Sequence, residues 1–191
     1  ARQYAAFPYN HNVLTEWTDA AKLFTPEVRQ IAHYSWHNTI PPHINVLIVG
    51  GGSGAQAAIF AKELEALHVR GTVTHLEPSP TAIRIARSFV ARHNLTHRVD
   101  FIQRTIEAYA RDTPPSTFDI ISCHGVLHHL ADPPTVLRSL NTLLTPRGAI
   151  DLLVYGKEGR SSLYSAQAAL RLMLPTDEIL TDAERLQELR N

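Results

Sequence analysis

Asn45-Val46-Leu47-Ile48-Val49-Gly50-Gly51-Gly52-Ser53-Gly54-Ala55 is the stretch that decides the fold of this chain. Its apolar first half predicts a buried strand, and its glycines predict a tight turn that leads into a helix. Free N–H groups at the start of such a helix favour a negatively charged group. The stretch therefore predicts a strand, a turn and a helix that together hold a ligand. The alternative is a tight turn that binds nothing.

Short apolar runs alternate with helical stretches after this turn. The predicted strands are Asn45–Val49, Thr72–Leu76, Val99–Gln103, Phe118–Cys123 and Ala149–Tyr155. The helices predicted between them are Gln56–His68, Thr81–Asn94, Ile106–Arg111 and Thr135–Leu144. Strands that alternate with helices indicate a parallel sheet covered on both faces. We therefore predict a doubly wound α/β fold with helices on both faces.

The segments on either side of this core differ from it. Residues 1–43 are aromatic and interrupted by prolines, and we predict an N-terminal helical extension or lid with helices at Thr15–Leu23 and Pro26–His37. The core is predicted over residues 44–156. Residues 157–191 have only helical character, with helices predicted at Ser161–Leu174 and Thr181–Leu189.

The composition excludes several classes of function. Lys plus Arg and Asp plus Glu both number 18, so no net charge attracts nucleic acid or an anionic membrane. No apolar run is long enough to span a bilayer. The eleven histidines are scattered without the spacing of a zinc site, so no metal is expected. The single cysteine, Cys123, cannot form an internal disulfide, which favours the cytoplasm.

Two adenosine-containing ligands fit the glycine turn. Gly50, Gly52 and Ala55 match the G-x-G-x-x-A pattern of dinucleotide sites. The turn has no lysine, which excludes a nucleoside triphosphate loop. Glu77 ends the second predicted strand, where its carboxylate can accept hydrogen bonds from the ribose of NAD or of S-adenosylmethionine (SAM). These residues leave both ligands open.

Three motifs resemble those of class I SAM-dependent methyltransferases. Residues Val46 to Gly54 resemble the first motif of that family. Residues Phe118 to Pro133, with the sequence L-H-H-L-A-D-P at their end, resemble its fourth-strand motif. Residues Leu143 to Ile150 resemble the turn before its fifth strand. The chain is thus similar to the type 11/12 methyltransferase domains over about residues 44 to 155.

The resemblance implies a Rossmann-like sheet of about five strands in the order 3-2-1-4-5. It implies SAM as cofactor, S-adenosylhomocysteine (SAH) as product, and methyl transfer by in-line displacement. The implied cofactor-binding residues are Gly50, Gly51, Gly52, Ser53, Gly54, Glu77, Pro78, Ser79, Arg104, Thr105, Ile106, His124 and Gly125. Ile48 and Thr105 stand where many members have an acidic residue, which puts the contacts to the SAM amino group and to adenine in doubt.

The chemistry at the acceptor is less defined. A base helps only when the acceptor must lose a proton, and His124 and His128 are the candidates. The alternative is that these histidines only pack or fix the loop. The predicted substrate or lid residues are Tyr9, Trp17, Tyr34, Trp36, Tyr155, Arg160 and Tyr164. The acceptor is expected to be a small molecule or a peptide or protein side chain, and the aromatic residues can equally be packing.

The family's sheet normally ends in two further strands, and we expect strands six and seven to be absent from this chain. We therefore expect an N-terminal portion of a longer or trimmed protein, whose helical surface at 161–189 is a candidate homodimer contact. Two other functions stay open. One is a methyltransferase-like module that binds SAM or SAH without turnover, and the other is an NAD-dependent oxidoreductase.

Overall fold

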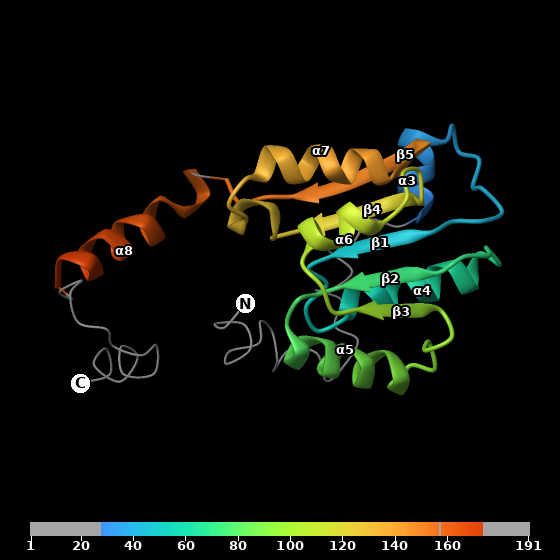
Figure 1. Cartoon of the computed structure of the whole chain (residues 1–191), viewed down its shortest axis with the longest axis horizontal. Helices are drawn as coiled ribbons and strands as arrows, with labels where there is room; N and C mark the ends of the chain where they lie inside the picture. Colours follow the sequence, from blue (N-terminus) through green and yellow to red (C-terminus); the bar gives the residue numbers. More distant parts are fainter. Residues whose placement is uncertain (1–27, 157, 174–191) are drawn as a thin grey trace. The chain divides into compact units, whose positions relative to one another are not determined.

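The structure is a computed structural model that describes residues 28–156 and 158–173 (Figure 1). The chain divides into two compact units, Ala1–Val154 and Tyr155–Asn191. The predicted helices at Thr15–Leu23 and Thr181–Leu189 lie outside the described residues. The predicted division into an extension, a core and C-terminal helices stays a prediction.

The first unit alternates strands and helices as predicted. Its strands are β1 (Val46–Val49), β2 (Val73–Leu76), β3 (Val99–Ile102), β4 (Phe118–His124) and β5 (Leu144–Leu153). Its helices are α3 (Val28–Ser35), α4 (Ala55–Ala66), α5 (Pro80–Arg92), α6 (Ile106–Asp112), α7 (Pro133–Leu143) and the short 3₁₀ turn η1 (Leu127–His129). Every strand and helix predicted between residues 45 and 155 is present, with ends shifted by a few residues.

The strands form one sheet in the order β3-β2-β1-β4-β5, which confirms the predicted topology. All four pairings are parallel. The register aligns Phe101, His75, Ile48, Ser122 and Asp151 in one row across the five strands. The side chains of one row lie on the same face of the sheet. This row is two residues before the end of β4 and borders the glycine turn.

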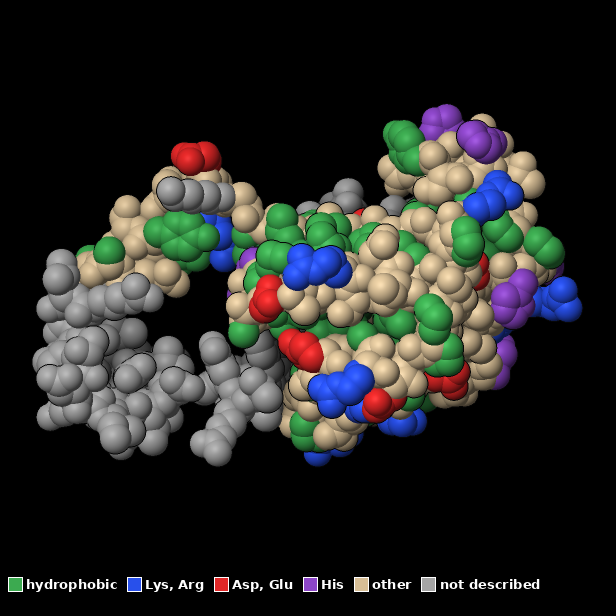
Figure 2. All heavy atoms as spheres, turned by 45° about the horizontal axis from the view of Figure 1, so that its top comes forward, with side chains coloured by type: hydrophobic (Ala, Val, Ile, Leu, Met, Phe, Trp, Pro, Cys, Tyr) green, Lys and Arg blue, Asp and Glu red, His purple; other side chains and the backbone are tan. Residues whose placement is uncertain are grey.

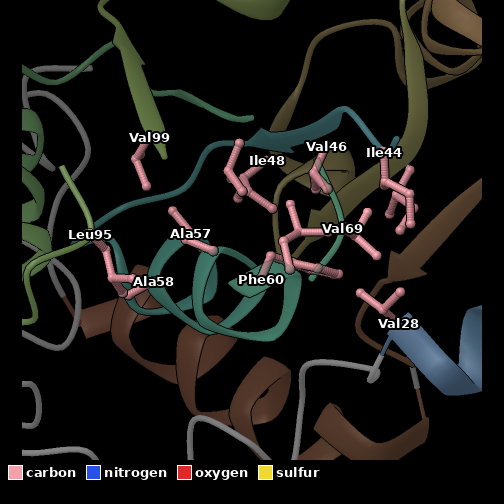
Figure 3. Close-up of a cluster of buried hydrophobic side chains, with 14 of the residues drawn as sticks. Val28, Ile44, Val46, Ile48, Ala57, Ala58, Phe60, Val69, Leu95 and Val99 are labelled. Carbon is pink, nitrogen blue, oxygen red and sulfur yellow. The ribbon is translucent and has the colours of Figure 1, made fainter. Parts of the chain in front are cut away.

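Alternate residues of the strands pack on opposite layers of helices. One buried cluster joins β1 and β4 to α3, α4 and α5, with Phe89 of α5 among its members. Ile48 and Phe60 of this cluster are labelled in Figure 3. The other joins Leu47 and Ile121 to α6, α7 and η1. The central strand β1 is buried on both faces. The glycine turn that follows it therefore starts from a rigid position.

The N-terminal helix α3 is packed on the core. Val28 and Ile31 belong to the same buried cluster as β1, and the Val28 N–H donates to the Glu63 carboxylate at 3.0 Å. Trp36 is 2% exposed, and its indole N–H donates to the Arg147 carbonyl at 2.6 Å. Residues 28–36 therefore act as part of the core's packing.

The start of β5 differs from the prediction. A turn was expected near Pro146 and Gly148, but β5 runs from Leu144 to Leu153. Its register shifts there, because Leu144 pairs with Phe118 and Ala149 pairs with Ile120. The strand therefore bulges where a separate turn was expected.

The second unit contains the turn η2 (Glu158–Arg160) and the helix α8 (Ser161–Met173). The Arg160 guanidinium lies 3.4 Å from the centre of the Tyr155 ring. Among the described residues, no helix is both long and apolar enough to cross a membrane. On the face shown in Figure 2, acidic and basic side chains of the described residues lie interspersed, without a large patch of one sign.

Candidate functional site

The candidate site lies at the carboxyl end of β1, where the sheet's connections diverge. β2 pairs on one side of β1 and β4 on the other, so the loops after β1 and β4 lead away in different directions (Figure 1). Such a point in an α/β sheet opens a crevice beside the strand ends. The turn Gly50–Gly54 lies there, and α4 begins at Ala55 without a side-chain cap on its first turn.

Glu77 connects the end of β2 to this turn. The residue is 8% exposed, and its carboxylate accepts hydrogen bonds from the Gly52 N–H at 3.1 Å and the Ser79 N–H at 2.9 Å. Each of these bonds uses a different oxygen, so each oxygen keeps a lone pair for a further donor. The carboxylate therefore fixes the turn and still offers acceptors to a ligand.

Two adjacent glycines in the turn face different surroundings. A Cβ on Gly51 would lie 2.4 Å from two atoms of the His75 ring, so the protein fills that side. A Cβ on Gly52 would meet nothing within 4 Å among the described atoms, and the Gly52 φ of +53° is in the left-handed region. Gly52 thus presents bare backbone to open space next to the Glu77 carboxylate.

His75 lies beneath the turn, in the middle of the sheet. Its ring is fully buried and packs against Phe101, with ring centres 5.3 Å apart. Burial lowers the pKa of His75 from 6.5 to about 4, the Gly52 main chain opposes this in part, and the Arg87 charge adds to it. His75 is therefore neutral at physiological pH.

Residues predicted along the adenosine and beside the adenine lie at the starts of the helices after β2 and β3. Ser79 caps α5, since its hydroxyl accepts from the Ala82 N–H at 3.3 Å, and Thr105 caps α6 through the Ala108 N–H at 3.3 Å. Ile106 is buried in the core. The Arg104 guanidinium pairs with Asp112 and donates to the Ala108 carbonyl at 2.9 Å, so it is held along α6.

A polar network lies at the end of β4. His124 Nε2 contacts Asp151 Oδ2 on β5, and Ser122 Oγ donates to the same oxygen at 3.1 Å. The other ring nitrogen, Nδ1, lies 2.8 Å from the Gln56 side-chain nitrogen in the first turn of α4. The side chains of His124 and Asp151 are 12% and 21% exposed. The network joins β4, β5 and the first turn of α4.

The remaining predicted residues are less closely grouped. Gly125 follows His124 with a φ of +69°, and His128 lies in η1 with its ring 4.1 Å from that of His129. Tyr34 is 78% exposed on α3, whereas Trp36 is buried. Tyr155, Arg160 and Tyr164 belong to the second unit, and Tyr9 and Trp17 lie outside the described residues.

The structure draws attention to site residues that the sequence did not single out: Gln56, His75, Ser122 and Asp151. The sequence pointed to two of them, because Asp151 and His75 are polar residues within predicted strands that are otherwise apolar. Nothing in the sequence distinguished Gln56, since polar residues are common on the surface of a helix. Among the described residues, no group of three or more His, Cys, Asp or Glu is placed to hold a metal ion.

Comparison with known proteins identifies the family to which the chain belongs. A family described as a methyltransferase domain matches residues 47–150, which is more than half of the chain. The ubiquinone biosynthesis O-methyltransferase of Vibrio parahaemolyticus is 30% identical over 140 residues, which cover 73% of this chain and 56% of that protein. The chain spans about half the length of such relatives, 49% in the case of the Klebsiella pneumoniae enzyme.

Solved structures share the fold. The arsenic(III) SAM methyltransferase of Chlamydomonas reinhardtii superposes with a TM-score of 0.51 at 27% identity, over 69% of this chain and 46% of that one. A methyltransferase named CalH, solved in complex with SAH, superposes with a TM-score of 0.53 at 20% identity, over 70% of this chain and 38% of that one.

Proposed function

Because the chain belongs to this family of methyltransferase domains, we propose that it binds SAM and transfers its methyl group to a small-molecule acceptor. The observation that carries the proposal is the pairing of a buried Glu77 carboxylate with the bare backbone of Gly52. When bound, SAM would supply a methyl carbon on a sulfonium for in-line attack by the acceptor's nucleophile, with the methyl C–S bond breaking and SAH as the leaving group. The domain's own task is to bind and orient both partners.

The residues present fit an adenosyl ligand. The carboxylate of Glu77 offers acceptors for the two ribose hydroxyls, and the open space at Gly52 lets a ligand approach the backbone. The uncapped first turn of α4 favours the ligand's carboxylate. We propose that Pro78 and Ser79 follow the adenosine, that Arg104 to Ile106 flank the adenine, and that Gly125 borders the methionine end.

The acceptor is proposed as a small molecule because the Vibrio relative is named as an O-methyltransferase of ubiquinone biosynthesis. The contacts on both nitrogens of His124 favour a positioning role for that ring, so His128 remains the proposed base. Tyr155, Arg160 and Tyr164 remain proposed acceptor contacts. Tyr34 is not retained, because α3 lies at the amino edge of the sheet, where the neighbouring Trp36 bonds Arg147 near the start of β5. A cytoplasmic location is proposed from the single, buried Cys123.

Calorimetric titration tests the proposal against its alternatives. We expect SAH and SAM to bind with measurable heat, and we expect no binding of NAD at the same concentration. Preferential binding of NAD would overturn the proposal. A module without turnover would bind both adenosyl compounds but transfer no radioactive methyl group from SAM to any small-molecule fraction of a cell extract.

The neighbouring glycines give a matched test of the site. Gly52→Ala is expected to weaken SAH binding about tenfold, because the new methyl group enters the open space that the ligand would use. It is also expected to lower the free energy of unfolding by about 1 kcal/mol, because alanine is strained at the left-handed φ of +53°. Gly51→Ala instead places its methyl group against the buried His75 ring, and is expected to lower the free energy of unfolding by about 1–3 kcal/mol. Titration calorimetry and urea unfolding of both variants separate the two effects. Equal affinity of Gly52→Ala and the unaltered protein would argue against a ligand at this turn.

A further inference from the structure

The polar network at the end of β4 joins three elements at the carboxyl edge of the sheet, beside the glycine turn. It runs from Ser122 through Asp151 and His124 to Gln56. Ser122 and Asp151 face each other in the sheet register, and His124 follows Ser122 by two residues on the same face of β4. Gln56 is half-buried in the first turn of α4, two residues after Gly54.

The contacts favour one set of proton positions. The Asp151 carboxylate is an acceptor only, so its contact with His124 favours the tautomer with the proton on Nε2. The Nδ1 of a neutral ring is then an acceptor, and the Gln56 amide must turn its NH₂ group toward it. One N–H of Gln56 is used in this way. Its carbonyl oxygen remains as an acceptor, and its second N–H remains as a donor, for a bound ligand.

We propose that Gln56 binds the zwitterionic amino-acid tail of the adenosyl ligand, and that His124 and Asp151 are positioning residues that hold its amide in one orientation. The inference rests on the proposed function. A carbonyl oxygen and an N–H match the ammonium donor and the carboxylate acceptor of such a tail.

The topology places Gln56 at the correct end of the crevice. Glu77, the proposed ribose ligand, lies at the tip of β2 on one side of β1, whereas His124 lies at the tip of β4 on the other side. A ligand with its ribose at Glu77 that passes over the turn at Gly52 reaches the β4 side with its tail. Ile48 lies between His75 and Ser122 in the row across the sheet, and its apolar side chain offers no hydrogen-bonding group to the tail. The tail must therefore find its polar partners on α4 and β4.

The test compares two ligands that differ only in the tail. SAH carries the amino-acid tail, and 5′-methylthioadenosine lacks it. Gln56→Ala is expected to weaken SAH about tenfold, since hydrogen bonds to charged groups are lost, and to change 5′-methylthioadenosine by less than about twofold. Gln30→Ala, on the exposed face of α3, is the matched control and is expected to change neither affinity.

The positioning role has its own variants. Asp151→Ala is expected to weaken SAH about as much as Gln56→Ala and to cost nothing further in the Gln56→Ala background, because both changes act through one amide. Asp151→Asn keeps an acceptor oxygen for Nε2 and is expected to restore the affinity. Nitrogen NMR of the His124 ring should show the proton on Nε2 in the unaltered protein and a mixture of tautomers in Asp151→Ala.

The outcomes separate the two hypotheses. If neither ligand binds the unaltered protein, the proposed function fails and the inference fails with it. If both ligands bind and Gln56→Ala weakens them equally, or weakens neither, the adenosyl site stands and the role of Gln56 is wrong. Additive losses in the double variant would refute the positioning role of Asp151.

Discussion

Replacing Glu77 by alanine is expected to weaken SAH binding on the order of a hundredfold. The Glu77 side chain makes two kinds of hydrogen bond, to the proposed ligand and to the turn, and an alanine makes neither. Its carboxylate is the proposed acceptor for the ribose hydroxyls, and it holds the Gly52 and Ser79 N–H groups in place. Loss of the charge-assisted bonds lowers affinity directly, and a loosened turn must be ordered again when the ligand binds. Titration calorimetry measures the affinity.

Two further variants make this result specific. Glu77→Gln keeps one acceptor oxygen but turns an NH₂ group toward a backbone donor, so an intermediate loss is expected. Glu65→Ala removes a half-exposed carboxylate that pairs with His97 at 2.7 Å, and it is expected to leave the affinity unchanged. A dissociation constant that stays the same in folded Glu77→Ala would exclude Glu77 as the ribose ligand.

The fold was predictable because the sequence repeats one unmistakable unit. Each strand is a short apolar run, each is followed by a helical segment, and parallel strands joined by helices allow few arrangements. The motifs at Val46–Gly54 and Phe118–Pro133 then fixed the strand order through a resemblance. The irregular start of β5 was not predictable, because a bulge depends on the partner strand and has no local signature.

The site was only partly predictable for a related reason. The glycine turn and Glu77 are local features, and they are adjacent in the fold because β1 and β2 are adjacent in the sheet. The contact between His124 and Asp151 joins residues 27 positions apart, and it exists only through the register of β4 on β5. A sequence displays both residues but not the register. Gln56 enters the network only once the start of α4 is placed beside β4.

The neutral, buried His75 predicts a loss of stability in acid. Its pKa is lowered to about 4 in the folded protein, whereas the unfolded chain should titrate near 6.5. Between these values the unfolded chain binds a proton that the folded protein does not, so stability rises with pH across this window. Above pH 6.5 the free energy of unfolding does not depend on the titration of His75. At about pH 4 the neutral, buried ring lowers the free energy of unfolding by about 3 kcal/mol relative to neutral pH.

Urea unfolding at neutral pH and at about pH 4 measures this cost. Carboxyl groups also titrate in this range, so the quantity to compare is the difference between variants. His75→Leu places an apolar side chain under the turn and removes the titrating ring, and it is expected to lose about 3 kcal/mol less unfolding free energy than the unaltered protein on acidification. His43→Leu changes an exposed ring and should acidify like the unaltered protein. If His75→Leu and the unaltered protein lose the same unfolding free energy on acidification, the prediction is wrong. The protonated His75 ring would then reach solvent at little cost, through a rearrangement of the turn above it.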